Sequence, residues 1–425
     1  MVQIMRKMKD SGIEWIGEIP EGWEVGQIGQ LYSERRTKVS DKDYPPLSVT
    51  MKGILPQLST AAKTDAHDDR KLVCKGDFAI NSRSDRRGSC GISEQDGSIS
   101  LINIVLQPRG EMNPGYYNWL FHTSMFADEF YKWGHGIVDD LWTTGWSDMK
   151  KIGVPVPSKC EQKQLAEHLN FECSNIDTIL SKTRSSIEEY KKLKQAVITQ
   201  AVTKGVRGER KMKDSGVECI GKIPTTYSIC KLKYLLKNPL KYGANESGIP
   251  YSDSLPRYIR ITDITPDGNL KYTGKLSLSE ESAKDYILED GDILFARSGA
   301  TVGKTFIYYQ SYGRSAYAGY LIKASLNNKV SPKFVYYYTC SSLYEIWKNS
   351  IFIQSTIQNI GADRYANLPV PVPKTLQEQE EIADYLDAKC AEIDKLIAKK
   401  EQLVKELECY KKSLIYEVVT GKREV

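Results

Sequence analysis

The sequence has few of the residues and motifs from which common active sites are built. It has four histidines, and none stands in an H-E-x-x-H pattern or beside a second ligand at metal-binding spacing. It contains no G-x-S-x-G nucleophile elbow, no G-x-G-x-x-G fingerprint and no Asn-Pro-Pro-aromatic tetrad of the kind that adenine methyltransferases use. These absences argue against a metalloenzyme, a serine hydrolase and a methyltransferase. We therefore predict no catalytic residue, no metal site and no cofactor in this chain.

Cysteine pairs and long apolar runs are also missing. The nine cysteines are scattered and include no C-x-x-C, which argues against a zinc ribbon and against a disulfide framework. No apolar run approaches the roughly 18 residues of a membrane span, and the N-terminus lacks the apolar core of a signal peptide. The net charge is only +5, so charge alone gives a weak argument for nucleic acid. We expect a cytoplasmic protein without a membrane partner.

What the sequence has is an internal repeat. The segment 8–20, MKDSGIEWIGEIP, returns at 212–224 as MKDSGVECIGKIP, with 10 of 13 positions identical. A repeat of about half the chain is too long for a solenoid or propeller, whose periods are roughly 20–50 residues. It predicts a duplicated domain pair with pseudo-twofold symmetry. Three further pairs follow in the same order, while the offset grows from 204 to 217: Gly76-Asp77 and Gly291-Asp292, Val154–Pro157 and Val370–Pro373, Glu161-Gln162 and Glu378-Gln379.

Each half ends in a predicted long helix with heptad spacing. Apolar residues recur at alternating spacings of four and three from Leu169 to Ala201 and again from Leu386 to Val418. This pattern is typical of helices that pack along their length. One such stripe usually faces a domain core, but two equivalent stripes favour an antiparallel pair. The predicted seam consists of Leu169, Ile176, Leu180, Ile187, Leu386, Ile393, Ile397 and Val404.

Local signals bound both helices. The motifs Ser158-x-x-Glu161 and Thr375-x-x-Glu378 are typical of capping boxes, and Gly205 and Gly421 predict the ends. The first helix would cover about 47 residues, or ~70 Å at 1.5 Å per residue. Two charged residues, Lys194 and Lys411, fall on the seam at equivalent positions. Snorkelling toward solvent and fixing of the helix register are both open for them.

Two globular segments lie between these helices. Both mix short β-rich runs with Gly and Asp, and each has a predicted helix, near Tyr116–Phe130 and near Pro332–Trp347. The predicted fold class is α+β, with two pseudo-symmetric domains of mixed α/β structure separated by two long antiparallel, coiled-coil-like helices. The predicted boundaries are 1–157, first domain; 158–210, central helix; 211–373, second domain; and 374–425, C-terminal helix. The sequences of the two domains differ more than the repeated motifs do, as expected for two recognition modules with different targets.

A loop rich in arginine and serine is the most similar segment outside the helices. Residues 76–88 align without gaps with 291–303, and in each copy a predicted strand runs into a Gly-bounded loop. Arginine suits guanine edges and phosphates, and hydroxyl side chains contact phosphates or bases. One such loop is more often a solvated hairpin, but two at equivalent places favour a nucleic-acid contact. The candidate DNA-binding residues are Arg83, Ser84, Arg86, Arg87, Arg297, Ser298, Thr301 and Lys304.

A second pair of loops precedes each Val-Pro-Val-Pro. Residues 142–148 contain two tryptophans, and residues 354–361 contain glutamine and asparagine, which pair well with adenine. These loops add Trp146, Gln358 and Asn359 to the candidate DNA-binding residues. For Trp146 the alternative of capping the domain core stays open, and it is the more common role of a tryptophan.

The segment Gly299–Thr305 is similar to a phosphate-binding P-loop but departs from it. Three residues separate its glycines where the motif needs four, and Ser298 stands where the first glycine belongs. The following residues, Phe306–Tyr309, have the pattern of a strand and not of the helix whose N-terminus would bind phosphate. A nucleotide-dependent enzyme is therefore a disfavoured alternative.

Taken together, these motifs resemble the specificity subunit of Type I restriction–modification systems. The resemblance extends along essentially the whole chain. It rests on the repeated D-S-G-x-E-x-I-G-x-I-P opening, segments 75–82 and 291–304, the Val-Pro-x-Pro and Glu-Gln pairs, the long helices and the ending 201–205. One departure is Cys219, where the first half has Trp15.

The resemblance implies a function without catalysis by this chain. Two target-recognition domains, 1–157 and 211–373, would each read one half of a split site on double-stranded DNA. The two antiparallel helices would hold them apart and dock two adenine-N6 methyltransferase subunits, which restriction/translocase subunits join for cleavage. S-adenosylmethionine, ATP and Mg²⁺ would belong to these partners. A helix of ~70 Å is about two turns of B-DNA, which predicts two short half-sites separated by unread base pairs.

The main alternative is a coiled-coil adaptor that does not bind DNA. An adaptor has no reason to vary between two matched scaffolds, so the diverged domains count against this alternative.

Overall fold

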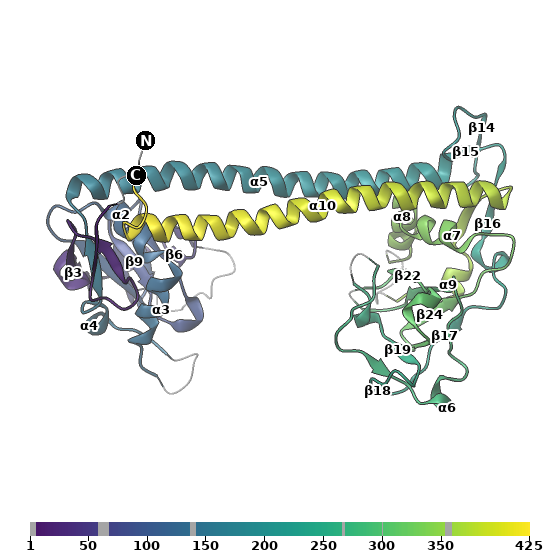
Figure 1. Ribbon diagram of the computed structural model, residues 1–425, viewed down its shortest axis with the longest axis horizontal. Helices are drawn as coiled ribbons and strands as arrows, with labels where there is room; N and C mark the ends of the chain where they lie inside the picture. The colour runs from purple at the N-terminus through teal and green to yellow at the C-terminus, as the bar shows by residue number, and fades with distance from the viewer. Residues whose placement is uncertain (1–5, 58–67, 137–141, 266–267, 300, 353–358) are drawn as a thin grey trace. The chain divides into compact units, whose positions relative to one another are not determined.

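The computed structural model describes residues 6–57, 68–136, 142–265, 268–299, 301–352 and 359–425. It divides into two compact units, one formed by Met1–Arg184 with Gln402–Val425 and the other by Ser185–Glu401. Both units mix helices and sheets, and each contains part of both long helices, α5 (Lys159–Lys204) and α10 (Leu376–Val419). The predicted fold class, mixed α and β with two domains and two long helices, is confirmed (Figure 1).

The first unit carries its sheets between the repeated opening and the start of α5. Its elements are β1 (Met8–Asp10), β2 (Glu18–Pro20), β3 (Glu24–Gln27), α1 (Ile28–Leu31), β4 (Tyr32–Glu34), β5 (Lys38–Val39), β6 (Leu47–Thr50), β7 (Gly53–Pro56), β8 (Arg70–Val73), β9 (Phe78–Asn81), η1 (Ser84–Arg86), β10 (Cys90–Ile92), β11 (Gly97–Ser100), β12 (Asn103–Pro108), α2 (Pro114–Phe121), α3 (Ser124–Lys132), α4 (Trp146–Met149) and β13 (Gly153–Val156).

The second unit follows the same order with different additions. Its elements are β14 (Met212–Asp214), β15 (Lys222–Pro224), β16 (Tyr227–Lys231), η3 (Leu232–Tyr234), β17 (Lys241–Tyr242), β18 (Ile249–Pro250), β19 (Arg257–Ile259), η4 (Ile261–Asp263), β20 (Leu276–Ser277), α6 (Glu280–Ala283), β21 (Ile293–Ala296), β22 (Thr305–Ile307), η5 (Gln310–Tyr312), β23 (Ser315–Tyr317), β24 (Leu321–Ala324), α7 (Pro332–Thr339), α8 (Ser342–Phe352), α9 (Ala362–Ala366) and β25 (Pro369–Pro373).

A shared sheet confirms that the two units are related by the repeat. Its strand order is β10-β9-β12-β4 in the first unit and β22-β21-β24-β17 in the second. In both, the strand that ends in Val-Pro-Val-Pro pairs with the strand after the repeated opening, as β13 with β3 and β25 with β16. The units differ in their second sheets, β11-β8-β5 against β18-β20-β19-β23. A common scaffold therefore carries different surfaces.

The long helices pack antiparallel within each unit. In the first unit, Arg184 of α5 forms an ion pair with Glu408 of α10. In the second, Lys400 of α10 lies over the ring of Tyr190 of α5, at 5.7 Å from the ring centroid. Among the predicted seam residues, Ile397 and Val404 are half-buried, while Leu169, Ile176, Leu180, Ile187, Leu386 and Ile393 are buried.

The helices also belong to the domain cores, which the seam pattern alone did not indicate. In the first unit Leu165, Leu169 and Ile176 share one apolar cluster with Trp23, Tyr116 and other core residues. In the second, Ile198 and Leu386 lie in one cluster with buried residues of the sheet and of α7. Each apolar stripe is therefore divided between the partner helix and the domain.

The local helix signals are met by hydrogen bonds. The Glu161 backbone donates to Ser158 Oγ and the Ser158 backbone donates to Glu161 Oε2, both at 3.3 Å, which completes the predicted capping box. At the second helix the Glu378 backbone donates to Thr375 Oγ1 at 3.4 Å. Gly205 and Gly421 follow the helices with φ of +76° and +69°, a conformation that glycine adopts without strain.

The predicted helix boundaries inside the domains are wrong. The helix predicted near Tyr116–Phe130 is two helices, α2 and α3, and the one near Pro332–Trp347 is α7 and α8. In both units the predicted helix is divided at a residue whose hydroxyl caps the start of the second helix. Thr123 Oγ1 accepts from the Phe126 backbone at 3.2 Å, and Ser341 Oγ accepts from the Tyr344 backbone at 3.4 Å.

The predicted domain boundaries at 157/158, 210/211 and 373/374 fall outside the long helices, whereas the compact units divide within them, after Arg184 and after Glu401. The assignment of 1–157 and 211–373 as target-recognition domains stays a prediction. In the part of the chain that the structure describes, no helix combines the length and the apolar character of a membrane span.

Candidate nucleic-acid interface

The arginine- and serine-rich loops join the same two strands in both units. In the first, β9 pairs antiparallel with β10, and the Asn81 backbone donates to Ser89 O at 2.9 Å. In the second, β21 pairs with β22, and the Ala296 backbone donates to Lys304 O at 2.8 Å. The gapless sequence alignment thus reflects two β-hairpins, β9 with β10 and β21 with β22, that pair in the same way.

A buried carboxylate holds the start of each hairpin. Asp77 Oδ2 accepts from the Cys74 backbone at 2.9 Å and from Arg35 Nε at 2.6 Å. The hydrogen bond that Arg35 donates to Asp77 holds the pKa of the Arg35 guanidinium above its ordinary value. Asp292 occupies the same place, and its Oδ2 accepts from the Glu289 backbone at 2.8 Å. The repeated Gly-Asp pairs therefore position the strands that lead into the loops.

The structure brings the two kinds of predicted loop together. Ser82 O accepts from the Thr144 backbone at 3.0 Å, and in the second unit Arg297 O accepts from the Ile360 backbone at 2.8 Å. Isolated β-bridges lie beside these bonds, between Arg83 and Thr143 and between Ser298 and Asn359. Each hairpin loop is thus joined to the loop before Val-Pro-Val-Pro. The predicted Gln358 lies outside the described residues.

In the first unit the loop arginines differ in freedom. Arg83 Nε lies 3.0 Å and Arg86 Nε 3.8 Å from carboxylate oxygens of Asp85. Arg87 forms an ion pair with Asp128 and lies over the ring of Tyr131, at 5.6 Å from the centroid. With 69% of its side chain exposed, Arg86 is the most accessible of the three.

The neighbouring candidates of the first unit are held more firmly. Ser84 lies in the single turn η1, and its backbone donates to Trp142 O at 3.0 Å. Trp146 begins α4 and is half-buried against the apolar core of this unit. Its position favours the core-capping role over base contact.

In the second unit the candidate DNA-binding residues Arg297 and Lys304 lie in different environments. The guanidinium of Arg297 lies 5.0 Å from the ring centroid of Tyr242, and its Nε is buried without a hydrogen-bond partner among the described residues. Lys304 is exposed and lines a groove of about 670 Å³ with residues of α5 and α10, including Lys194 and Asp394. Thr301 lies between them, half-buried, and its carbonyl accepts from the Lys304 backbone at 3.0 Å.

Sequence reasoning missed aromatic and histidine neighbours of these loops. Tyr320 is 62% exposed, and its carbonyl accepts from the Arg297 backbone at 3.0 Å. The Tyr242 hydroxyl accepts from the Ala362 backbone at 3.0 Å. In the first unit His135 forms a bridge with Thr143 and lies 3.5 Å from Asp148. No motif marks these residues, since they come from distant segments.

The segment similar to a P-loop lies between β21 and β22 and does not lead into a helix, as a P-loop does. The Gly303 backbone donates to Ala296 O at 2.9 Å, and the residues after Lys304 form strand β22. The prediction of a strand at this place is confirmed. Among the described residues, a strand and not a helix follows Lys304, so no helix N-terminus faces this loop to bind a phosphate.

Comparison with known proteins assigns the fold to a family. Residues 250–406 match the family model described as the type I restriction modification DNA specificity domain. Along its whole length the chain is similar to type I restriction–modification specificity subunits. A curated relative, the MjaVIII specificity subunit of Methanocaldococcus jannaschii, is 24% identical over 455 aligned residues, covering 100% of this chain and 99% of the relative. The EcoKI specificity subunit of Escherichia coli is 21% identical over 86% of this chain and 82% of its own.

Solved specificity subunits have the same fold at low sequence identity. A chain from a structural study of the assembly of a type I restriction–modification system aligns with a TM-score of 0.74 and 13% identity, covering 95% of this chain and 99% of that one. The HsdS subunit of Thermoanaerobacter tengcongensis aligns with a TM-score of 0.53 and 14% identity, covering 95% and 98%. The similarity to type I specificity subunits thus supports a role in DNA sequence specificity.

Proposed function

We propose that this chain recognises a bipartite DNA site, with one unit reading each half. The observation that carries the proposal is the repeated pair of joined loops. The same backbone hydrogen bonds connect them in both units, whereas their side chains differ, with Arg83 and Thr143 in one and Ser298 and Asn359 in the other. Two domains that recognise different half-sites can share one backbone arrangement but require different side chains at the DNA.

Within these loops the candidates divide by accessibility. Exposed Arg86 and Lys304 suit phosphates or base edges that approach from solvent. Arg297, Ser298 and Asn359 lie on joined segments and offer a guanidinium, a hydroxyl and an amide, which can read base edges. We assign supporting contacts to Ser84, Arg83, Arg87 and Thr301. Trp146 contributes by packing.

We also propose that the long helices dock two adenine-N6 methyltransferase subunits, which restriction/translocase subunits join for cleavage. Apolar side chains stay exposed on α5, with Phe171 at 64% and Ile179 at 47% in the first unit and Leu193 at 47% in the second. Exposed apolar side chains on a helix are suited to a protein partner. S-adenosylmethionine, ATP and Mg²⁺ would be bound by these subunits, and the complex would work in the cytoplasm.

The test is methylome sequencing of a host with and without this chain. We expect one split adenine-methylation motif to disappear on deletion and to return on complementation. Retention of every motif, or loss of an uninterrupted one, would contradict the proposal. The purified chain given S-adenosylmethionine and DNA should methylate nothing, and methylation by the chain alone would show that it is itself an enzyme.

A further inference from the structure

A glutamate near the start of α10 connects three separate segments of the second unit. Glu378 is the third residue of this helix, and its side chain is 7% exposed. It forms an ion pair with Arg210, which is 16% exposed, and accepts from the Tyr227 hydroxyl at 3.1 Å. Arg210 precedes the repeated opening and Tyr227 follows it, so both ends of that opening are tied to the first turn of α10.

The first unit repeats this arrangement with a different aromatic residue. Glu161, the third residue of α5, forms an ion pair with Arg6 and accepts from Trp23 Nε1 at 3.2 Å. Arg6 and Trp23 precede Arg210 and Tyr227 by 204 residues, the offset of the repeated opening. Since tryptophan and tyrosine differ in shape but both donate to the glutamate, the hydrogen bond is the shared feature.

The neighbouring glutamine ties the same helix turn to the short helices. Gln379 Oε1 accepts from the Ser331 backbone at 2.7 Å, and its Nε2 donates to Pro373 O at 3.1 Å. Gln162 Oε1 accepts from the Asn113 backbone at 2.8 Å in the first unit. Ser331 and Asn113 are the N-cap residues of α7 and α2. Each Glu-Gln pair therefore joins two parts of its domain to one helix turn.

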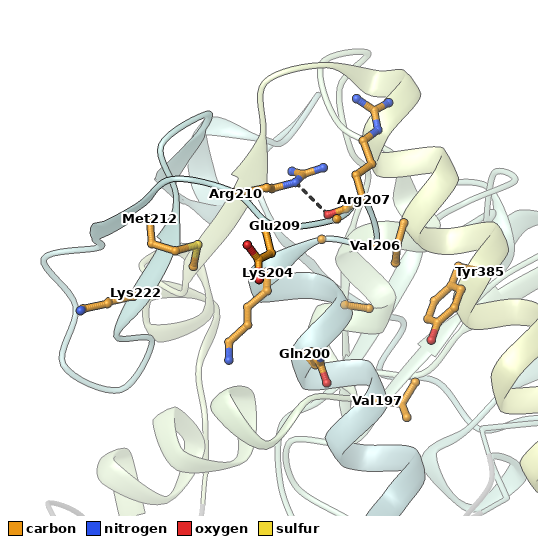
Figure 2. A pocket seen from close by; sticks show the side chains of 13 residues that line it. Val197, Gln200, Lys204, Val206, Arg207, Glu209, Arg210, Met212, Lys222 and Tyr385 are labelled. Atoms are coloured by element: carbon orange, nitrogen blue, oxygen red, sulfur yellow. Dashed lines mark hydrogen bonds between the residues drawn. The ribbon is translucent and has the colours of Figure 1, made fainter.

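The end of the other long helix fits against the same aromatic ring. A Cβ on Gly205, directly after α5, would lie 2.8 Å from the Tyr227 hydroxyl oxygen, and a Cβ on Gly421, after α10, would lie 2.9 Å from Trp23 Cη2. Figure 2 shows this corner of the second unit, where Lys204, Arg207 and Arg210 follow one another and Tyr385 enters from α10. A side chain at either glycine would therefore collide with the aromatic residue that the glutamate binds.

We propose that Glu378 and Glu161 are positioning residues that fix the angle of each recognition domain on its helices. The inference rests on the proposed function and deepens it. The glutamates would determine how strictly the complex demands one spacer length between the half-sites, without contact to the DNA. Tilting a domain on its helix would break the charge-assisted hydrogen bonds of the glutamate and the hydrogen bonds of the neighbouring glutamine. The helix N-terminus also stabilises the negative charge of the glutamate.

The experiment uses the assembled methyltransferase complex and DNA duplexes that carry the half-sites found by methylome sequencing. Each duplex has the native spacer or a spacer one base pair shorter or longer. Methylation rates give a spacer preference for the wild type and for Glu378→Gln, Tyr227→Phe, Tyr227→Trp and Glu380→Gln. Tyr227→Phe keeps the ring and loses the donor, whereas Tyr227→Trp installs the residue of the first unit. Glu380 is exposed on the same helix and provides the matched control.

We expect Glu378→Gln to lower the spacer preference roughly tenfold, or about 1.4 kcal/mol of discrimination. Tyr227→Phe should lower it roughly threefold, while Tyr227→Trp and Glu380→Gln keep the wild-type value. A general loss of stability would reduce all rates alike and leave the ratio unchanged. If Glu378→Gln does not fold, the two Tyr227 variants carry the test.

The outcomes separate this inference from the proposed function. A wild-type complex without any preference for a split site would overturn both. A wild type that demands its native spacer, together with folded variants that demand it equally, would overturn the positioning role alone.

Discussion

Lys194 of α5 forms an ion pair with Asp394 of α10, with Nζ 2.6 Å from Oδ2. The repeat places Lys411 of α10 at 2.6 Å from Asp177 Oδ1 of α5 in the first unit. The heptad spacing predicts both lysines on the helix seam and leaves snorkelling and register fixing as the two alternatives. Their ion pairs to the facing helix favour register fixing, because a shift of one helix turn would separate both pairs.

This pair predicts a measurable but small coupling. Removing Lys194 and Asp394 singly and together should give an interaction free energy of about 0.2–1 kcal/mol, because Asp394 is largely exposed to water. Urea unfolding of the four variants measures it. The pair Lys389 and Glu392, within one helix, is the control, with about 0.3–0.5 kcal/mol expected. A zero coupling for Lys194 would show that the pair does not contribute to register.

The loop arginines should affect one half-site each. Replacing Arg83, Arg86 and Arg87 with Ala should impair recognition by the first unit only, and replacing Arg297 and Lys304 should impair the second. A lost base contact costs about 1–3 kcal/mol of discrimination, whereas a lost phosphate contact weakens all sequences and lowers the salt slope by about 1. Binding of the complex to duplexes with one altered half-site, at several salt concentrations, distinguishes these results.

The matched control for that experiment is Arg109→Ala, an exposed arginine outside the loops, which should change neither half-site. Unchanged affinity in both loop variants would mean that the loops are scaffold and that the site assignment is wrong.

Acid should weaken the first unit through Glu161. Burial raises the pKa of this carboxyl, but hydrogen bonds from Arg6, Trp23 and Ser158 outweigh it, so the pKa in the folded protein lies below the ordinary value. A lowered folded pKa stabilises the protein above the unfolded pKa, about 4.3, and this contribution is lost as the pH falls toward the folded value. The measurement is thermal unfolding between about pH 6 and 3, a range that brackets the ordinary pKa of a glutamate. Tm should decline less for Glu161→Gln than for the wild type. Equal declines would mean that Glu161 is not a source of the acid sensitivity.

The length of the long helices should set the gap between half-sites. Four residues inserted after Ser181, which is exposed within α5, add ~6 Å of rise and slightly more than one helical turn. The packed faces stay roughly in phase, so the half-site sequences should persist with a gap longer by about one or two base pairs. Methylome sequencing of cells with the altered chain measures the gap. A changed half-site sequence, or the old gap at full activity, would exclude the helices as the spacer.

Much of the fold was predictable because its signals are local or periodic. The repeat predicted two related units, and Ser158-x-x-Glu161 and Gly205 predicted where α5 begins and ends. The strand before each arginine-rich loop also followed from neighbouring residues. The division of α2 from α3 at Thr123 was missed, although the capping hydroxyl is local, because the apolar pattern continues across the break.

Only the tertiary structure decided which distant residues meet. It joined Arg83 to Thr143 and Ser298 to Asn359, and it gave Lys304 and Arg297 different surroundings although one loop holds both. The sequence by itself determined the duplication, the helix ends and the loop chemistry, since periodicity and capping act over a few residues. It could not determine that Arg6 would pair with Glu161, because hydrogen bonds between distant segments form only when packing brings their side chains together.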